Sequence, residues 1–188
     1  LDSAKLKADR KTAGIKSGMT VSPDFANKFS QNGKRLFFGL TPVRQPKDTN
    51  IVDFETARLD IWNYKDDELQ PQQLLQATME LRRSYLSVIH DDANTTVSLA
   101  DENLERIELA DEDNGDIALG ESTKGYRVQN QWEQFNYQKL FLVNVRTGER
   151  KMIADKIADS GLFNPMIFKA CSAGIEAMNK AGTIAKYL

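Results

Sequence analysis

The chain of 188 residues contains one cysteine, Cys171, and one histidine, His90. A single cysteine excludes an internal disulfide and any metal cluster held by several thiolates. No run of about 18 apolar residues occurs, so the sequence predicts no membrane-spanning helix. The chain begins with Leu1 and lacks the apolar segment of a signal peptide, and we interpret it as a processed or cut piece.

Neither sign of charge dominates the chain. It has 25 Lys and Arg residues against 27 Asp and Glu residues, a net charge of −2. This balance predicts no nucleic-acid partner and no anionic membrane partner. The first 16 residues are basic and residues 101–116 are acidic, and such runs are typical of solvated faces. The length and the 40% share of hydrophobic residues suffice for one domain with a sizeable core.

Short strand-like segments separated by turn residues fill most of the chain. Asn32-Gly33 predicts a tight hairpin turn before an apolar strand that ends at Leu40. Residues 69–81 fit either a short helix after Pro71 or an extended passage. Short strands at close spacing indicate an all-β sandwich, barrel or propeller, and composition does not choose among the three. Further candidate strands are residues 51–64, 84–89, 96–99, 104–109, 116–119, 126–132 and 140–145.

The end of the chain differs in character. Asn164 is suited to cap a helix and Pro165 to begin one. Apolar residues then follow at roughly helical spacing up to Leu188. Gly174 and Gly182 each weaken a helix by about 1 kcal/mol relative to alanine. We predict a helical tail over residues 160–188.

The segment Phe29–Leu40 reads F-S-x-x-G-x-R-L-F-F-G-L. It resembles the strand-turn-strand signature of β-propeller blades in the prolyl oligopeptidase family, which includes dipeptidyl peptidase IV. The order of the later segments is similar to large bacterial members of that family, especially those of Bacteroidetes, and the likeness covers roughly residues 20–157. Its segments are residues 52–54, 59–66, 69–71, 83–88, 99–102, 114–120 and 137–145, followed by the T-G-E hairpin at 146–151.

The resemblance implies a mainly β fold, a partial β-propeller with about two blades of antiparallel sheet and a C-terminal helical tail. We divide the chain into a loop-rich lead-in (1–26), the blades (27–159) and the tail (160–188), which the likeness does not cover. In this family the propeller sits over an α/β-hydrolase domain and admits only short or flexible peptides. The implied partners are therefore such a domain of the same parent protein and peptide substrates, and the implied location is periplasmic or secreted.

A serine hydrolase of this family requires a serine on a G-x-S-x-G elbow, a histidine base and an orienting acid. The sequence contains no G-x-S-x-G. The segment A-C-S-A-G at 170–174 lacks the leading glycine, and we interpret Ser172 as a helical serine. His90 precedes two aspartates at 91–92 and is interpreted as a strand-end histidine, with nothing to bring Cys171 to it. We therefore assign no catalytic residue and predict that the chain alone hydrolyses no peptide.

The acidic segment Asp111-x-Asp113-x-Gly115-Asp116 is similar to a calcium-binding loop. An EF-hand loop has glycine at position six and glutamate at position twelve. Here glycine falls at position five and Ser122 at position twelve, so we interpret the segment as a hairpin turn with Asn-Gly at its tip. No metal ligand and no cofactor-binding residue is assigned.

Several aromatic residues fall at strand-like positions, where they either pack between blades or line a peptide-binding surface. Packing between blades is the interpretation we favour. Asn94 opens a glycosylation sequon, which has little meaning in a bacterial protein. The aromatic residues are Trp62, Tyr64, Trp132, Phe135 and Tyr137.

Two other functions stay open at this point. The chain is either a free-standing propeller-like module for protein interaction, or a truncated gene product without function. The second alternative is suggested by the abrupt change of pattern after Ser160.

Overall fold

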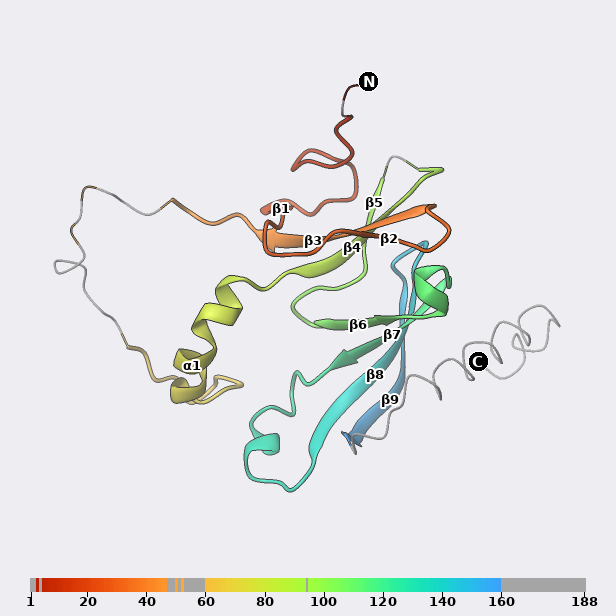
Figure 1. The fold of residues 1–188 in the computed structure, drawn as a ribbon. Helices are drawn as coiled ribbons and strands as arrows, with labels where there is room; N and C mark the ends of the chain where they lie inside the picture. The colour runs from red at the N-terminus through yellow and green to blue at the C-terminus, as the bar shows by residue number, and fades with distance from the viewer. Residues whose placement is uncertain are drawn as a thin grey trace.

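The structure is a computed structural model that describes residues 3, 5–46, 50, 52, 60–93 and 95–159. Within these ranges the chain is mainly β, with two antiparallel sheets and one α-helix (Figure 1). The predicted fold class, a propeller-like partial fold with two sheets, is confirmed. The predicted helical tail, 160–188, lies outside the described residues, and so do Cys171 and Ser172.

The first sheet contains β1 (Met19–Val21), β2 (Lys28–Phe29), β3 (Arg35–Pro42), β4 (Tyr85–His90) and β5 (Thr96–Ser98). β1 and β2 both pair antiparallel with β3, one along each end of it, so they act as one interrupted strand. β3 pairs with β4, and β4 pairs with β5. Residues 22–27 loop out between β1 and β2, and Gly39 makes room for them. A Cβ at Gly39 would lie 2.5 Å from the Cβ of Phe25.

The second sheet contains β6 (Arg106–Leu109), β7 (Ile117–Ser122), β8 (Asn136–Asn144) and β9 (Arg150–Asp159). Each strand pairs antiparallel with the next one in the chain. The register between β8 and β9 shifts twice, as at a β-bulge, and such shifts bend and twist a sheet. Four consecutive antiparallel strands are the arrangement of a propeller blade.

The core lies between the two sheets. Side chains alternate along a strand, so the cross-strand pair Phe37 and Val88 points to one face of the first sheet. On that face they pack with Ala118 and Val143 of the second sheet, and all four side chains are fully buried. Burial of such large apolar side chains stabilises the fold by about 1.5–3 kcal/mol each. This contact holds the sheets face to face.

The lead-in belongs to the first sheet. Phe38 and Ile89 point away from the second sheet, and Ile15 of the lead-in packs in the cluster that they form with Leu40. The N–H of Thr96 in β5 donates to the carbonyl of residue 13 at 2.7 Å. The first sheet is therefore covered on both faces, and the lead-in also bonds to β5.

The single helix α1 (Gln70–Leu81) lies in the long connection between β3 and β4, with a proline in its first turn. The helical alternative for residues 69–81 is thus confirmed. Residues 60–63 are not a strand, and 126–132 form a turn with a 3₁₀ segment at Gln129–Gln131, so both strand predictions are wrong where the structure describes them. None of the helices in the described ranges is long and apolar enough to cross a membrane.

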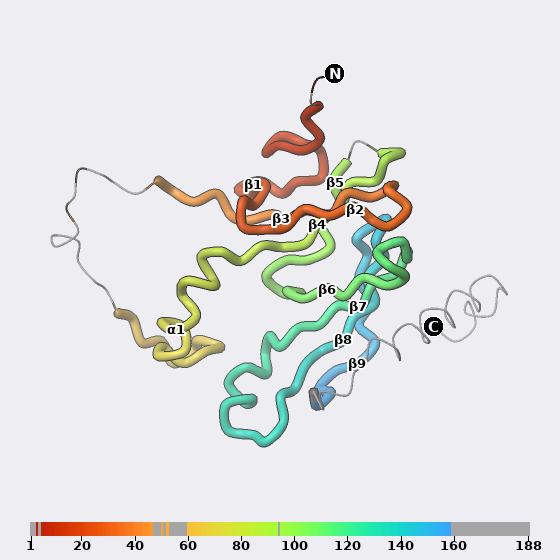
Figure 2. Tube along the Cα trace, viewed as in Figure 1, coloured from red at the N-terminus to blue at the C-terminus, as the bar shows by residue number. Residues whose placement is uncertain are grey.

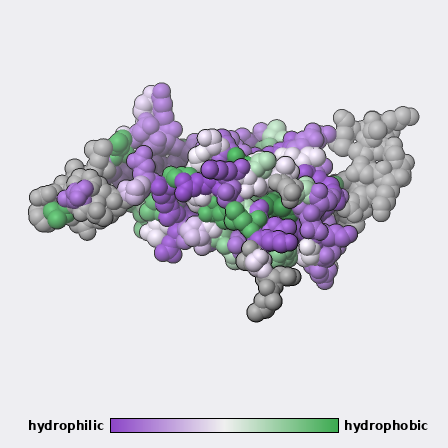
Figure 3. All heavy atoms as spheres, turned by 90° about the horizontal axis from the view of Figure 1, so that it is seen from above, coloured by the Kyte–Doolittle hydropathy of each residue, from purple (hydrophilic) through white to green (hydrophobic). Residues whose placement is uncertain are grey.

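The connections divide between the two ends of the sheets (Figures 1 and 2). At the tight-turn end lie the short turns at residues 30–34, 91–95, 110–116 and 145–149. At the long-loop end lie the connections 43–84, 99–105 and 123–135. This division follows from strict up-and-down order, because alternate connections of a meander fall at opposite ends. Seen from above, the described surface is mostly hydrophilic, with hydrophobic residues gathered near the middle (Figure 3).

Candidate functional site

At the tight-turn end, Arg35 joins the two sheets. This residue begins β3 and is almost fully buried, on the face that points to the second sheet. Its guanidinium donates to the backbone oxygens of Asn114, at 2.8 Å, and of Gly115, and pairs with the carboxylate of Asp116. The N–H of Asn32 donates to Asn114 Oδ1 at 3.1 Å. The oxygens of the β6–β7 turn are therefore bonded to a cationic side chain of the first sheet.

The segment similar to a calcium loop is this same turn. Asp111, Glu112 and Asp113 have left-handed backbone, with φ of 51°, 52° and 69°, whereas Asn114 has φ of −90°. The prediction that Asn-Gly forms the tip is thus wrong, because three acidic residues turn the chain. Lys28 pairs with Asp113 at 2.8 Å. Among the residues that the structure describes, no group of three or more His, Cys, Asp or Glu is placed to hold a metal ion.

His90 ends β4, as predicted, and its side chain is only 6% exposed. Its Nε2 lies 3.1 Å from the carbonyl oxygen of Val145, so this nitrogen carries the proton and donates. A hollow of about 430 Å³ lies beside it, where Arg146 pairs with Asp116 and Asp92 at 3.2 and 3.6 Å. The described residues that line this hollow include no serine, threonine or cysteine that His90 might activate. His90 is thus a structural link between the sheets.

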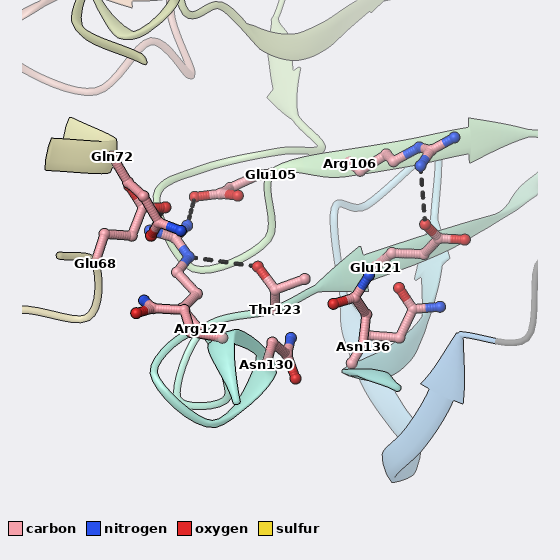
Figure 4. Close-up of a pocket in the computed structure, with 11 residues that line it drawn as sticks. Glu68, Gln72, Glu105, Arg106, Glu121, Thr123, Arg127, Asn130 and Asn136 are labelled. Carbon is pink, nitrogen blue, oxygen red and sulfur yellow. Dashed lines mark hydrogen bonds and ion pairs between the residues drawn. The ribbon is translucent and has the colours of Figure 1, made fainter. Parts of the chain in front are cut away.

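At the long-loop end, a second hollow of about 390 Å³ opens beside β6 and β7 (Figure 4). The connection that carries α1 borders it on one side, and the loop between β7 and β8 borders it on another. Its lining is polar throughout, with three carboxylates, two guanidinium groups, one hydroxyl and five side-chain amides. The residues are Glu68, Gln72, Glu105, Arg106, Glu121, Thr123, Arg127, Asn130, Gln131, Asn136 and Gln138.

Arg127 pairs with two of the carboxylates in this hollow. It pairs with Glu68 at 3.3 Å and with the carboxylate of Glu105. Glu105 is also 3.3 Å from Arg83, which pairs in turn with Glu80. The hydrogen bond from Arg83 lowers the pKa of Glu80, and the same bond raises the pKa of Arg83. This network ties the α1 connection to the start of β6 and to the β7–β8 loop.

Arg106 balances the third carboxylate. It extends from β6 and lies 3.6 Å from Glu121 and 3.6 Å from Glu108. Its side chain is largely exposed, so these pairs are weak, at about 0–1 kcal/mol each. With three carboxylates against two guanidinium groups, the lining has a formal charge of −1.

The amides of the hollow differ in how their hydrogen bonds are satisfied. Asn130 accepts from the backbone N–H of Tyr137 at 2.7 Å and donates to its carbonyl at 3.0 Å, as a neighbouring strand would. Gln131 Oε1 and Nε2 are both buried and without a hydrogen-bond partner. Gln138 is only 7% exposed. The hollow therefore contains unused donors and acceptors of uncharged groups.

Exposed aromatic residues lie at the same end of the molecule. Trp62, Tyr64, Trp132 and Phe135 are all exposed, so the prediction that they pack between blades is wrong for these four. Tyr137 is half-buried, and its ring lies 6.3 Å from that of Tyr126. Trp132 directly follows Gln131, and Phe135 directly precedes Asn136. Two of the aromatic residues thus adjoin residues that line the hollow.

Sequence reasoning did not single out the residues of this hollow. Glu68, Glu105 and Arg127 have no shared spacing, because they come from three separate connections that only the fold brings together. Asn94 lies outside the described residues. Comparisons with protein-family models, with curated proteins and with solved structures find no match to this chain.

Proposed function

We propose that this chain is a non-catalytic β-propeller segment of a prolyl-oligopeptidase-like serine peptidase. In this role it restricts the access of peptides to a hydrolase domain and docks that domain, which these 188 residues do not contain. The observation that carries the proposal is the pair of antiparallel meanders stacked face to face, with the two longest connections at one end. A periplasmic or secreted location belongs to the same proposal.

The two ends suit different parts of this role. The turns at the tight-turn end are bonded to one another through Arg35 and His90, which keeps the blades rigid. Most of the exposed large hydrophobic side chains lie on the long connections, and in the described residues none lies in a tight turn. Exposed apolar groups gathered in one region mark interaction surfaces. We assign the docking of the hydrolase domain to the long-loop end.

Two blades require neighbours. A propeller closes with at least four blades. In the described part of the chain, β6 and β9 each pair with a strand on one side only. Open edges are prone to pair with other chains unless they are covered. Further blades of the parent protein would supply the neighbour that β9 lacks, and the edge of β6 beside the hollow would stay open.

The test is to read the coding region that continues in frame after the codon for Leu188, and to express the whole product. We expect further blades and a G-x-S-x-G elbow in that frame. The product should hydrolyse short peptides and spare folded proteins, and removal of residues 1–159 should abolish this discrimination. A frame without the elbow, or a product whose size selection is unchanged by the removal, contradicts the proposal.

A free-standing interaction module is the second candidate, and the exposed side chains of α1 favour it. Leu74, Leu75 and Met79 suit any protein partner with an apolar surface. A stop codon directly after Leu188 in the native gene, together with a cooperative thermal transition of the isolated chain, would select this candidate. A non-cooperative transition would indicate a truncated product.

A further inference from the structure

We infer that the hollow at the long-loop end binds the interior of a peptide chain through its uncharged peptide groups, and not a charged chain end. This inference rests on the proposed function, because it names the part of a peptide that the segment recognises. It concerns a site lined by residues of four separate stretches of the chain. Some hydrogen-bonding groups of the hollow are already paired within the chain, and others are not.

The charges of the hollow are occupied. A free amino terminus binds to carboxylates, but Glu68 and Glu105 are already paired with Arg127. A free carboxylate terminus binds to a guanidinium, but the guanidinium of Arg127 is held between those same two glutamates. A charged chain end would need to displace an existing ion pair. A neutral group needs no such exchange.

The amides of the hollow are available. Gln138 is more than nine-tenths buried and lines the hollow with its amide-bearing side chain. Gln131 has a buried donor and a buried acceptor that are both unpaired. A side-chain amide offers one carbonyl and one NH₂ group, which match the N–H and C=O of a peptide unit. Buried unpaired polar groups are costly, so a peptide unit that pairs with them gains affinity.

The hollow already contains one pairing of this kind. Asn130 bonds to both the N–H and the C=O of Tyr137, at 2.7 and 3.0 Å. This arrangement demonstrates that a side-chain amide at this place can hold a backbone peptide group on both sides. Gln131 follows directly in the chain and has the same functional group.

The surroundings favour a peptide over other neutral ligands. β6 contributes Arg106 to the hollow and is the edge strand of its sheet among the described strands. An extended peptide can pair with such an edge through its backbone. The exposed side chains of Trp132 and Phe135, next in the chain to hollow residues, supply apolar contact for peptide side chains. Backbone pairing of this kind depends little on the sequence of the peptide. This suits a segment that restricts the access of many different peptides.

The test compares two forms of one pentapeptide, Ala-Ala-Pro-Ala-Ala, titrated into the full 188-residue chain and followed by ¹⁵N chemical shifts. One form has an acetylated amino terminus and an amidated carboxyl terminus, and the other has free ends. We expect the blocked form to bind at least as tightly as the free form. We expect the largest shifts at Gln131, Gln138 and their neighbours.

Three variants test the residues. Gln138→Leu keeps the size of the side chain and removes its amide, and we expect at least a fivefold loss of affinity for the blocked peptide. Gln72→Leu on helix α1 provides a second variant that disturbs no strand. The matched control is Gln129→Leu, since Gln129 bonds to Glu133 and does not line the hollow, and its affinity should stay within twofold of the parent chain.

Three results would overturn the inference: no binding of the blocked peptide at millimolar concentration, binding of the free form more than tenfold tighter, or unchanged affinity in both hollow variants. The proposed function is judged separately, by the size selection of the whole product. A product that selects short peptides while its hollow binds only free chain ends would refute this inference alone. Binding of the blocked peptide by a chain without a hydrolase in frame would refute the proposed function alone.

Discussion

The two ends of the pair of sheets differ in the length of their connections and in how the side chains there are bonded. At the tight-turn end, short turns bring charged groups of both sheets within direct hydrogen-bonding distance, and a buried arginine satisfies backbone oxygens of the opposite sheet. At the long-loop end, the connections are long enough to carry a helix and a 3₁₀ turn, and they leave apolar side chains exposed and the buried amide of Gln131 without a hydrogen-bond partner. One end therefore stabilises the pair of blades, and the other is available for recognition.

The largest effect should follow from removal of the link at the tight-turn end. Arg35→Leu leaves the backbone oxygens of Asn114 and Gly115 without their donor and removes one of the two arginines that pair with Asp116. We expect a loss of about 3 kcal/mol in the free energy of unfolding, measured by urea denaturation. Arg44→Leu is the matched control, because Arg44 is exposed and pairs with Asp24 at 3.4 Å. Equal losses in both variants would contradict the role of Arg35.

A smaller effect should follow at Gly39, where β3 passes under the looped-out residues 22–27. In Gly39→Ala the new Cβ meets Phe25 at 2.5 Å, and we expect a loss of about 1–3 kcal/mol. The double variant with Phe25→Gly should recover part of this loss, because it removes the Cβ and the ring of Phe25 that the new methyl group meets. Gly18→Ala is the control for a glycine-to-alanine change without a clash, since its Cβ would meet nothing within 4 Å. The positive φ of 83° at this position has a modest cost of its own. Additive losses in the double variant would mean that no such clash exists.

Acid should weaken the contact between the connection 99–105 and the start of β9, where Asp101 pairs with Arg150 at 2.8 Å. Burial raises the pKa of Asp101, but hydrogen bonds from the N–H of Asn103 and from Arg150 outweigh it, and the net shift is downward. A lowered pKa means that this contribution is complete above the ordinary value of 3.8 and is lost as the pH falls through the lower value in the folded chain.

Since Asp101 is about half exposed, we expect only about 0.5 kcal/mol from it. Between pH 5 and pH 3, the thermal midpoint of the parent chain should fall further than the midpoint of Asp101→Asn. The difference between the two decreases should correspond to roughly 0.5 kcal/mol of stability. An identical acid dependence of the two chains would show that this carboxylate does not contribute.

A substitution on α1 should have the smallest effect on stability and the largest effect on docking. Leu75 is 83% exposed, so Leu75→Glu should change the free energy of unfolding by less than about 0.5 kcal/mol. The same change should weaken the association of the chain with its hydrolase domain at least tenfold, measured by calorimetry. Lys34→Glu places a carboxylate at the tight-turn end and should leave that association unchanged. Weakening by both variants, or by neither, would contradict the assignment of docking to the long-loop end.

Local sequence patterns predicted the secondary structure correctly where the chain forms regular strands and tight turns. The apolar run that ends at Leu40 and the strand-forming residues of 84–89 predict β3 and β4, and both strands are present. The turn at Gly148 has the positive φ that its T-G-E sequence favours. By contrast, residues 126–132 contain strand-forming residues but form a turn, because Asn130 takes the place of a neighbouring strand beside Tyr137. That contact spans two segments, so no local pattern reveals it.

The sequence by itself determined the class of the fold, since short alternating segments with turn residues between them have few arrangements other than antiparallel sheets. It also determined that this chain has no G-x-S-x-G elbow. The tertiary structure alone decided that the arginine of the first sheet bonds to the acidic turn, and that Glu68, Glu105 and Gln131 meet in one hollow. The physical reason is the distance along the chain over which each influence acts. Secondary-structure propensity depends on neighbouring residues, whereas these groups are distant in sequence and are brought together by the burial of the face between the two sheets.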